Sequence, residues 1–341
     1  MTKLLRTGVV AAALFAPIAL SPVQAQTTLR YSDYLPTTHY LTVQGSQPFM
    51  DAVAAATNGA VNFQHFPAQQ LGQTADFLRL TQDNVAQISV VGVSFLADAM
   101  ELSNVAQMPG AFDSACAGLD AYNAILDTTP LRELDFTRHG VKLLMSYVLP
   151  QFEVVSTFGP ITGIEDFRGR VILVATRAAE LLLNEMGGAP IQTTAGTSAY
   201  EMVTRGTIDG LIFAADSTVA YDLHSVTRYG TTNGGFGGMV VAVIMNQSAF
   251  DALDSETQAI IEAEAERAER AICEYVDKKN SEALETIAAS GVELTTFPDE
   301  VLAEIAVHAD AVATRWAEEL GSRGVPGGTV LEAYRAAIAA N

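Results

Sequence analysis

Residues 170–213 read RVILVATRAAELLLNEMGGAPIQTTAGTSAYEMVTRGTIDGLIF. The run at 170–175 has the length and apolar composition of a buried strand, and 178–186 has helical periodicity that ends at two glycines. A second helix is expected at 199–205 and a second strand at 208–213. Strands that alternate with helices indicate an α/β protein whose sheet is covered by helices.

The same alternation extends to both sides of this stretch. The pattern predicts strands at 28–34, 60–66, 87–93, 141–148 and 239–245, and helices at 41–56, 71–83 and 255–289. The first third of the chain is therefore expected to form a largely parallel sheet. The helix expected at 255–289 is long enough to contact more than one lobe.

The N-terminus has the layout of a secretory signal peptide. Lys3 and Arg6 precede an apolar run at 8–20, and small residues at positions 23 and 25 predict cleavage after Ala25. The run has about 13 residues, whereas a membrane-spanning helix needs roughly 20. We therefore expect an exported protein. Its mature chain of about 316 residues is long enough for two lobes.

The net charge limits the class of partner. The full chain of 341 residues carries a formal charge of −20. Nucleic acids and anionic membranes are unsuitable partners, because both require clustered lysine and arginine. The acidity itself does not name a ligand, since much of it is explained by solubility.

The motifs of common enzyme classes are missing from the sequence. It contains no Gly-x-Ser-x-Gly elbow and no phosphate-binding loop, and its five histidines lack metal-ligand spacing. The segment GGFGG at 234–238 precedes a strand rather than a helix, so we expect it to supply backbone freedom near a hinge or pocket. The sequence predicts a binding protein without a cofactor or a metal.

The two cysteines carry little information by themselves. Cys116 and Cys273 are able to pair in an oxidising compartment, but they are far apart in sequence. Cysteine commonly packs as a small apolar side chain, and this favours free, buried thiols.

Several short motifs, in order and with their spacing, resemble one family. They are LRY at 29–31, LPTTH at 35–39, FPAQQLG at 66–72, FRG at 167–169, GAPI at 188–191, AYE at 199–201 and GTIDG at 206–210. The chain from about 29 to beyond 289 resembles the periplasmic solute-binding subunits of TRAP (tripartite ATP-independent) transporters.

The resemblance implies two α/β lobes around a ligand cleft, with a long helix that spans both. The expected boundaries are a leader at 1–25, a first lobe at 26–149 with a returning segment at about 237–265, and a second lobe at 150–236 with part of 266–341. It further implies a monomer that closes on a small organic ligand and delivers it to an ion-gradient-driven TRAP permease. The alternative is a sensory receptor that presents its ligand to a membrane kinase or chemoreceptor.

The chain departs from the family at the residues that hold the ligand. Most members clamp a carboxylate with an arginine four residues after the glycine of the FRG motif, where this chain has Leu173. Phe152 and Phe213 fall at two further polar positions of the family. One interpretation is that the ligand is cationic, neutral or more apolar, held by aromatic faces with an acid nearby. The other is that Arg177 reaches in and an anion remains the ligand.

We favour the first interpretation, because a carboxylate buried without a partner is costly. The candidate ligand-binding residues are Tyr34, His39, Tyr40, Gln70, Ser94, Tyr147, Phe152, Glu153, Leu173, Arg177, Phe213, Asp216 and Phe236.

Overall fold

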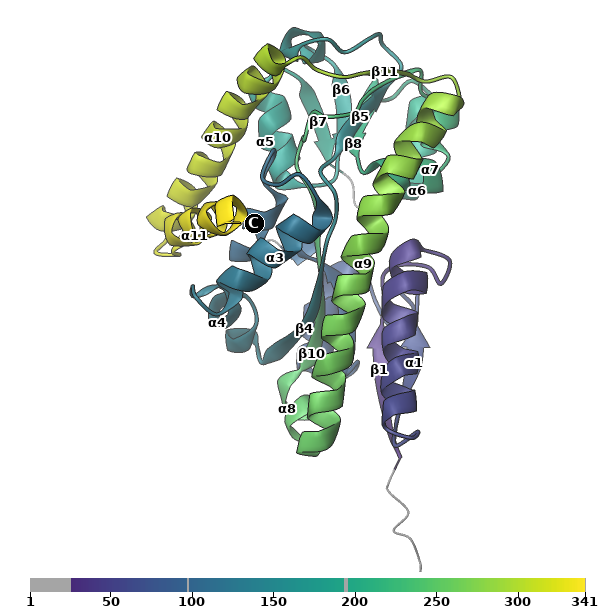
Figure 1. Ribbon diagram of the computed structural model, residues 1–341, viewed down its shortest axis with the longest axis vertical. Helices are drawn as coiled ribbons and strands as arrows, with labels where there is room; N and C mark the ends of the chain where they lie inside the picture. Colours follow the sequence, from purple (N-terminus) through teal and green to yellow (C-terminus); the bar gives the residue numbers. More distant parts are fainter. Residues whose placement is uncertain (1–25, 97, 193–195, 341) are drawn as a thin grey trace, which may run out of the picture.

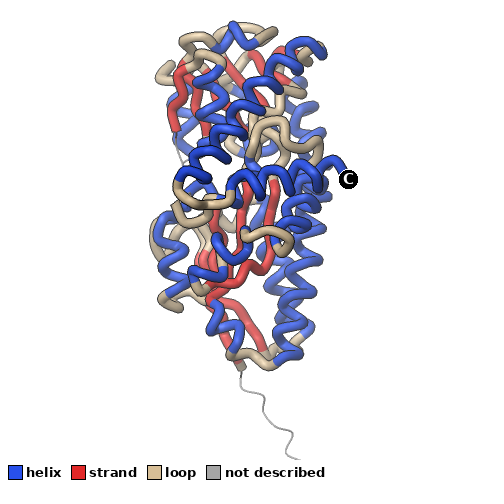
Figure 2. Tube along the Cα trace, turned by 90° about the vertical axis from the view of Figure 1, so that its left-hand side faces the viewer, coloured by secondary structure: helices blue, strands red, loops and turns tan. Residues whose placement is uncertain are grey.

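The protein has two lobes, each built around one sheet, as shown by a computed structural model that describes residues 26–96, 98–192 and 196–340. The lobes are stacked along the long axis of the molecule, and one helix, α9 (Ser255–Ala289), runs beside both (Figures 1 and 2). The leader expected at 1–25 lies outside the described residues. Within the described part of the chain, no helix has both the length and the apolar composition needed to cross a bilayer.

The sheet of the first lobe has the strand order β2-β1-β3-β10-β4. Its strands are β1 (Thr27–Ser32), β2 (Val61–Phe66), β3 (Ile88–Gly92), β4 (Val141–Val148) and β10 (Val240–Asn246). β1 is parallel to β2 and β3, as expected, but β10 is antiparallel to both β3 and β4. The parallel sheet predicted for the first third of the chain is confirmed for β1, β2 and β3. The antiparallel strand β10 comes from later in the chain and enters from the other lobe.

The sheet of the second lobe has the order β11-β9-β5-β8-β6-β7. Its strands are β5 (Glu153–Ser156), β6 (Val171–Val174), β7 (Ala189–Gln192), β8 (Gly210–Phe213), β9 (Tyr229–Thr231) and β11 (Glu293–Thr295). β6 is parallel to β7 and β8, and a helix precedes each of these two strands. The two strands and two helices expected for 170–213 are present, but β7 was not predicted. The lobe boundaries proposed from the sequence stay a prediction.

Helices cover both sheets. They are α1 (Gln47–Ala56), α2 (Phe77–Gln82), α3 (Ala115–Leu126), α4 (Leu131–Asp135), α5 (Arg177–Glu185), α6 (Gly196–Thr204), α7 (Ala215–Ala220), α8 (Gln247–Asp251), α10 (Asp299–Ser322) and α11 (Gly327–Ala340), besides α9.

The helix expected at 71–83 is shorter in the structure. Gly72 has a φ of +157°, and a 3₁₀ turn (Thr74–Asp76) precedes α2, so regular helix begins only at Phe77.

The long helix α9 has the bounds expected from its periodicity. Its first turn is capped by Asp254, whose side chain accepts a hydrogen bond of 2.9 Å from the Thr257 N–H. α9 packs on α1, α3 and β4 in the first lobe and on α7 in the second. The two C-terminal helices also connect the lobes, because α10 packs on α5 of the second lobe and α11 packs on α3 of the first (Figure 1).

The chain crosses between the lobes at 149–152 and 232–239, and these two segments are bonded to each other. The Phe152 N–H donates to Gly237 O at 2.6 Å, and the Phe236 N–H donates to Phe152 O at 2.9 Å. A Cβ at Gly234 would lie 2.0 Å from the ring of Phe236, so glycine is required there. The GGFGG segment thus lies where the lobes join, in the position expected of a hinge.

Glu153 fixes this junction from the side. Its carboxylate accepts hydrogen bonds from Thr231 Oγ1 at 2.5 Å and from the Gly234 N–H at 3.0 Å. Burial raises the pKa of Glu153 to about 7, although these hydrogen bonds counteract part of the rise.

The prediction of free thiols was wrong. Cys116 on α3 and Cys273 on α9 form a disulfide, with their Cα atoms 4.9 Å apart. The Asp277 carboxylate reinforces this contact by accepting hydrogen bonds from the N–H groups of Ala115 and Cys116, at 2.6 and 3.1 Å. Spacing in the sequence gave no sign of the pair, because 157 residues separate the two cysteines.

Removal of this crosslink should destabilise the protein. We expect the Cys116→Ala/Cys273→Ala double variant to lose about 2–4 kcal/mol of unfolding free energy, since the open unfolded chain gains conformational freedom. Urea unfolding with and without dithiothreitol measures the loss. Reductant should lower the stability of the wild type towards that of the variant and leave the variant unchanged. A wild type that is insensitive to reductant would contradict the disulfide.

Candidate ligand-binding pocket

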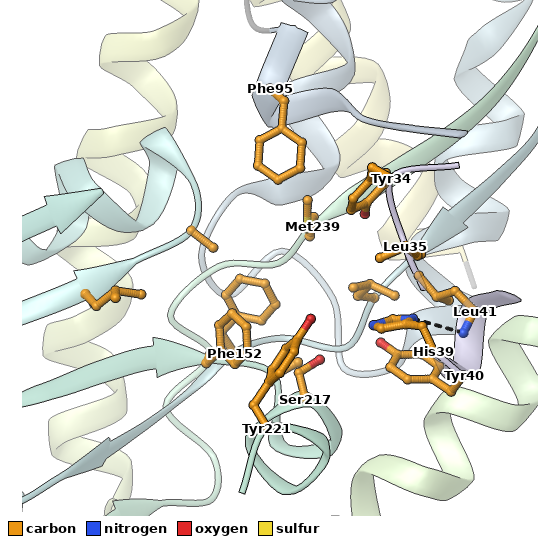
Figure 3. A pocket seen from close by; sticks show the side chains of 15 residues that line it. Tyr34, Leu35, His39, Tyr40, Leu41, Phe95, Phe152, Ser217, Tyr221 and Met239 are labelled. Atoms are coloured by element: carbon orange, nitrogen blue, oxygen red, sulfur yellow. Dashed lines mark hydrogen bonds between the residues drawn. The ribbon is translucent and has the colours of Figure 1, made fainter. Parts of the chain in front are cut away.

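A pocket lies between the lobes, where several strands end. Tyr34 follows β1, Phe95 follows β3, Ala175 follows β6 and Ala214 follows β8. Ligands of open α/β sheets commonly bind outside the carboxyl ends of the strands, and here the strand ends of both sheets face one cavity. The lining residues are Tyr34, Leu35, His39, Tyr40, Leu41, Phe95, Leu149, Phe152, Leu173, Ala175, Phe213, Ala214, Ser217, Tyr221 and Met239 (Figure 3).

The walls of the pocket are apolar and aromatic. Phe213 contacts Phe152 and Tyr221, with ring centroids 6.2 and 6.0 Å apart. Among the described lining residues there is no arginine, lysine or carboxylate. The free volume is about 80 Å³, well below the roughly 300–1,000 Å³ of typical small-molecule sites. A ring-sized ligand therefore requires movement of the lobes or of the lining side chains.

The structure brings six of the predicted site residues to this pocket: Tyr34, His39, Tyr40, Phe152, Leu173 and Phe213. Three of them, Phe152, Leu173 and Phe213, are the apolar residues that motif spacing predicts at the family's polar positions. Leu173 is 1% exposed, so a polar side chain there would need a partner within the pocket.

The other seven predicted residues do not line it. Tyr147 and Phe236 are fully buried in the core, Gln70 is exposed, and Ser94 donates a hydrogen bond to Gln107. Glu153 holds the crossover segments. Arg177 is exposed and forms an ion pair of 2.5 Å with Glu180. Asp216 lies behind Tyr40 and faces a neighbouring groove beside α9.

Sequence reasoning missed nine lining residues: Leu35, Leu41, Phe95, Leu149, Ala175, Ala214, Ser217, Tyr221 and Met239. The strand-end rule offered a signal for Phe95, Ala175 and Ala214, because each lies at or just beyond the end of a predicted strand. No sequence signal marked Tyr221, which lies just beyond the short helix α7.

His39 is an uncharged donor in the wall of the pocket. Its Nδ1 accepts a hydrogen bond of 3.2 Å from the Leu41 N–H, so the proton of the neutral ring is carried by Nε2. The ring stacks on Tyr40, with centroids 4.5 Å apart. Burial lowers the pKa of His39 to about 4, because the charged form would lose its hydration.

Behind Tyr40 lies a buried carboxylate. Asp216 Oδ1 accepts hydrogen bonds from the N–H and the hydroxyl of Ser217, at 2.6 and 3.3 Å. Asp216 Oδ2 and the Tyr40 hydroxyl are also buried, but neither has a hydrogen bond of regular geometry to any described residue. Burial raises the pKa of Asp216, and the nearby Tyr40 hydroxyl counteracts part of the rise.

The described residues contain no cluster of three or more histidines, cysteines or acids arranged to hold a metal ion.

Comparison with known proteins identifies the family. Residues 32–319 match the bacterial extracellular solute-binding protein family 7 (DctP), and the chain belongs to this family. The resemblance inferred from the motifs is confirmed. As a member of a solute-binding family, the protein is a receptor and not an enzyme.

Relatives and solved structures agree with this assignment. The chain is 24% identical over 333 residues to the outer membrane transporter protein TsaT of Comamonas testosteroni, with 97% of each chain covered. It is 26% identical over 265 residues to the ectoine-binding periplasmic protein TeaA of Halomonas elongata, with 75% of each covered. A Bordetella bronchiseptica TRAP periplasmic solute-binding protein with bound mandelate has a TM-score of 0.80 at 24% identity, covering 92% of this chain and 98% of that one.

The pKa of His39 can be tested directly. Because its pKa is lower in the folded than in the unfolded protein, the unfolded chain binds more protons between about pH 6.5 and pH 4. His39 therefore weakens the fold as the pH falls through this range, and His39→Gln should lose less stability on acidification than the wild type. Urea unfolding at pH 7, 5 and 4, with His308→Gln as the control, measures this difference. An NMR titration in which His39 protonates near pH 6.5 would contradict it.

Proposed function

We propose that this protein is a periplasmic TRAP-type receptor whose signal peptide is removed on export. It captures a small organic molecule in the pocket between its lobes and delivers it to a membrane permease. The observation that carries the proposal is one aromatic, apolar pocket lined by strand ends and loops of both lobes. A ligand that contacts both lobes favours the closed form over the open one, which gives the permease a signal that the site is filled.

We further propose that the ligand is not held by an arginine–carboxylate clamp. Structural relatives carry acids with rings, including 3-hydroxybenzoate and benzoate. The aromatic walls of the present pocket suit a ring, but Leu173, Phe152 and Phe213 supply no charge. Arg177 is unsuited to replace the clamp, because its guanidinium is exposed and already bonded to Glu180.

A ligand screen should separate neutral or cationic ligands from acids. We expect the mature protein to be stabilised by amines, betaines or neutral ring compounds and not by simple carboxylates. Thermal shift against a panel of these classes measures the effect, since a ligand at 100 times its Kd adds about 2.7 kcal/mol of apparent stability. If simple carboxylates were the only compounds that stabilise the protein, the proposal that the ligand is held without an arginine–carboxylate clamp would be wrong. Deletion of the gene should then abolish cellular uptake of the compound found.

Substitution at Leu173 tests whether the family's anchor position lines the site. Leu173→Arg should weaken binding of the screened ligand at least about ten-fold, because an unpaired guanidinium would be buried against apolar walls. Leu173→Met keeps the volume and the apolar character and serves as the matched control. Titration calorimetry on both variants, with circular dichroism to verify folding, makes the comparison. Unchanged affinity in Leu173→Arg would show that the position lies outside the site.

A further inference from the structure

Asp216 is a buried carboxylate that lacks a counter-ion. Its side chain is 9% exposed, and none of the ion pairs among the described residues involves it. The nearest groove does contain an ammonium group, that of Lys279, but this group pairs with Glu282 and lies over the ring of Tyr275. A carboxylate held in apolar surroundings without a cation is costly, and a bound cation would remove that cost.

Two hydroxyls separate this carboxylate from the pocket. The Ser217 hydroxyl donates to Asp216 Oδ1 at 3.3 Å, and the buried Tyr40 hydroxyl lies close to the same carboxylate, without a hydrogen bond of regular geometry. Both residues line the pocket, and Figure 3 shows them on the same side of it as Tyr221. A hydroxyl that directs its proton towards a carboxylate presents its oxygen lone pairs on the other side. This wall of the pocket therefore accepts hydrogen bonds from a ligand.

The remaining polar and aromatic groups suit the same ligand. Tyr34, Tyr40 and Tyr221 line the pocket, and the face of an aromatic ring attracts a cation. His39 is neutral at pH 7, so it does not repel a positive charge. A carboxylate ligand would instead meet two acceptor oxygens backed by a negative charge.

We propose that the ligand is a protonated primary or secondary amine with an apolar body. The apolar body contacts Phe152, Leu173 and Phe213, and the ammonium group donates hydrogen bonds to Tyr40 Oη and Ser217 Oγ, with Asp216 as the counter-charge. This inference rests on the proposed receptor function and names the ligand class for the same pocket.

Three probes of similar size and different charge test the inference: benzylamine, benzyl alcohol and benzoate. Titration calorimetry on the mature protein at pH 8, a pH chosen to favour the ionised form of Asp216, should give the tightest binding with benzylamine and no binding with benzoate. Asp216→Asn has the same shape without the charge, and it should weaken benzylamine binding at least about ten-fold while leaving benzyl alcohol unchanged. Tyr40→Phe, which loses only the hydroxyl, should weaken benzylamine binding several-fold.

Asp222→Asn is the matched control, because Asp222 follows the same helix and is exposed, so its charge is screened. It should leave all three affinities unchanged. Equal affinity of wild type and Asp216→Asn for benzylamine would overturn the inference. If benzyl alcohol bound and benzylamine did not, the proposed ammonium site would be wrong, whereas the proposed receptor function would stand. Binding of none of the three would count against both.

Discussion

The structure depends on the hydrogen bonds that join the two crossover segments. Phe152 and Gly237 are bonded across the junction, and Glu153 fixes the glycine-rich segment from the side. The same segments supply Leu149, Phe152 and Met239 to the wall of the pocket. The position of the pocket therefore depends on this junction, and any rotation of the lobes changes the pocket as it changes the crossover. Glycine at 234 is part of this constraint, because a side chain there would overlap the ring of Phe236.

The chemistry of the pocket follows from where its residues sit. Strand ends contribute the apolar walls, and the polar groups come from the loop after β1 and from α7. All of the polar groups that line it are uncharged at pH 7, because tyrosine and serine hydroxyls do not ionise at this pH and burial lowers the pKa of His39 to about 4. In the proposed site, the charge would come from Asp216, which lies behind Tyr40 and Ser217.

Much of the fold was predictable because its elements have strong local patterns. The bounds of α9 follow from an uninterrupted helical period, and the two strands and two helices expected in 170–213 are present, although β7 between them was not predicted. The direction of β10 was not predictable, since it depends on the chain returning from the other lobe. In the site, Leu173, Phe152 and Phe213 could be located from motif spacing. Tyr147 and Phe236 are aromatic like several pocket residues, and only the packing of the folded protein places them in the core.

The contact between α3 and α9 has a mechanical consequence. The disulfide and the Asp277 carboxylate attach the middle of α9 to α3 of the first lobe. The part of α9 beyond this attachment, residues 278–289, is about 18 Å long at about 1.5 Å per residue. Ala283 and Ile287 in this part of the helix pack against α7 of the second lobe. A bend of about 5° at the attachment point would move the C-terminal end of α9 by about 1.5 Å, which is the scale of helix shifts in proteins that switch conformation. Lobe closure by gentle curvature of this one helix would move Asp216 and Ser217 on α7 relative to Tyr40, which belongs to the first lobe.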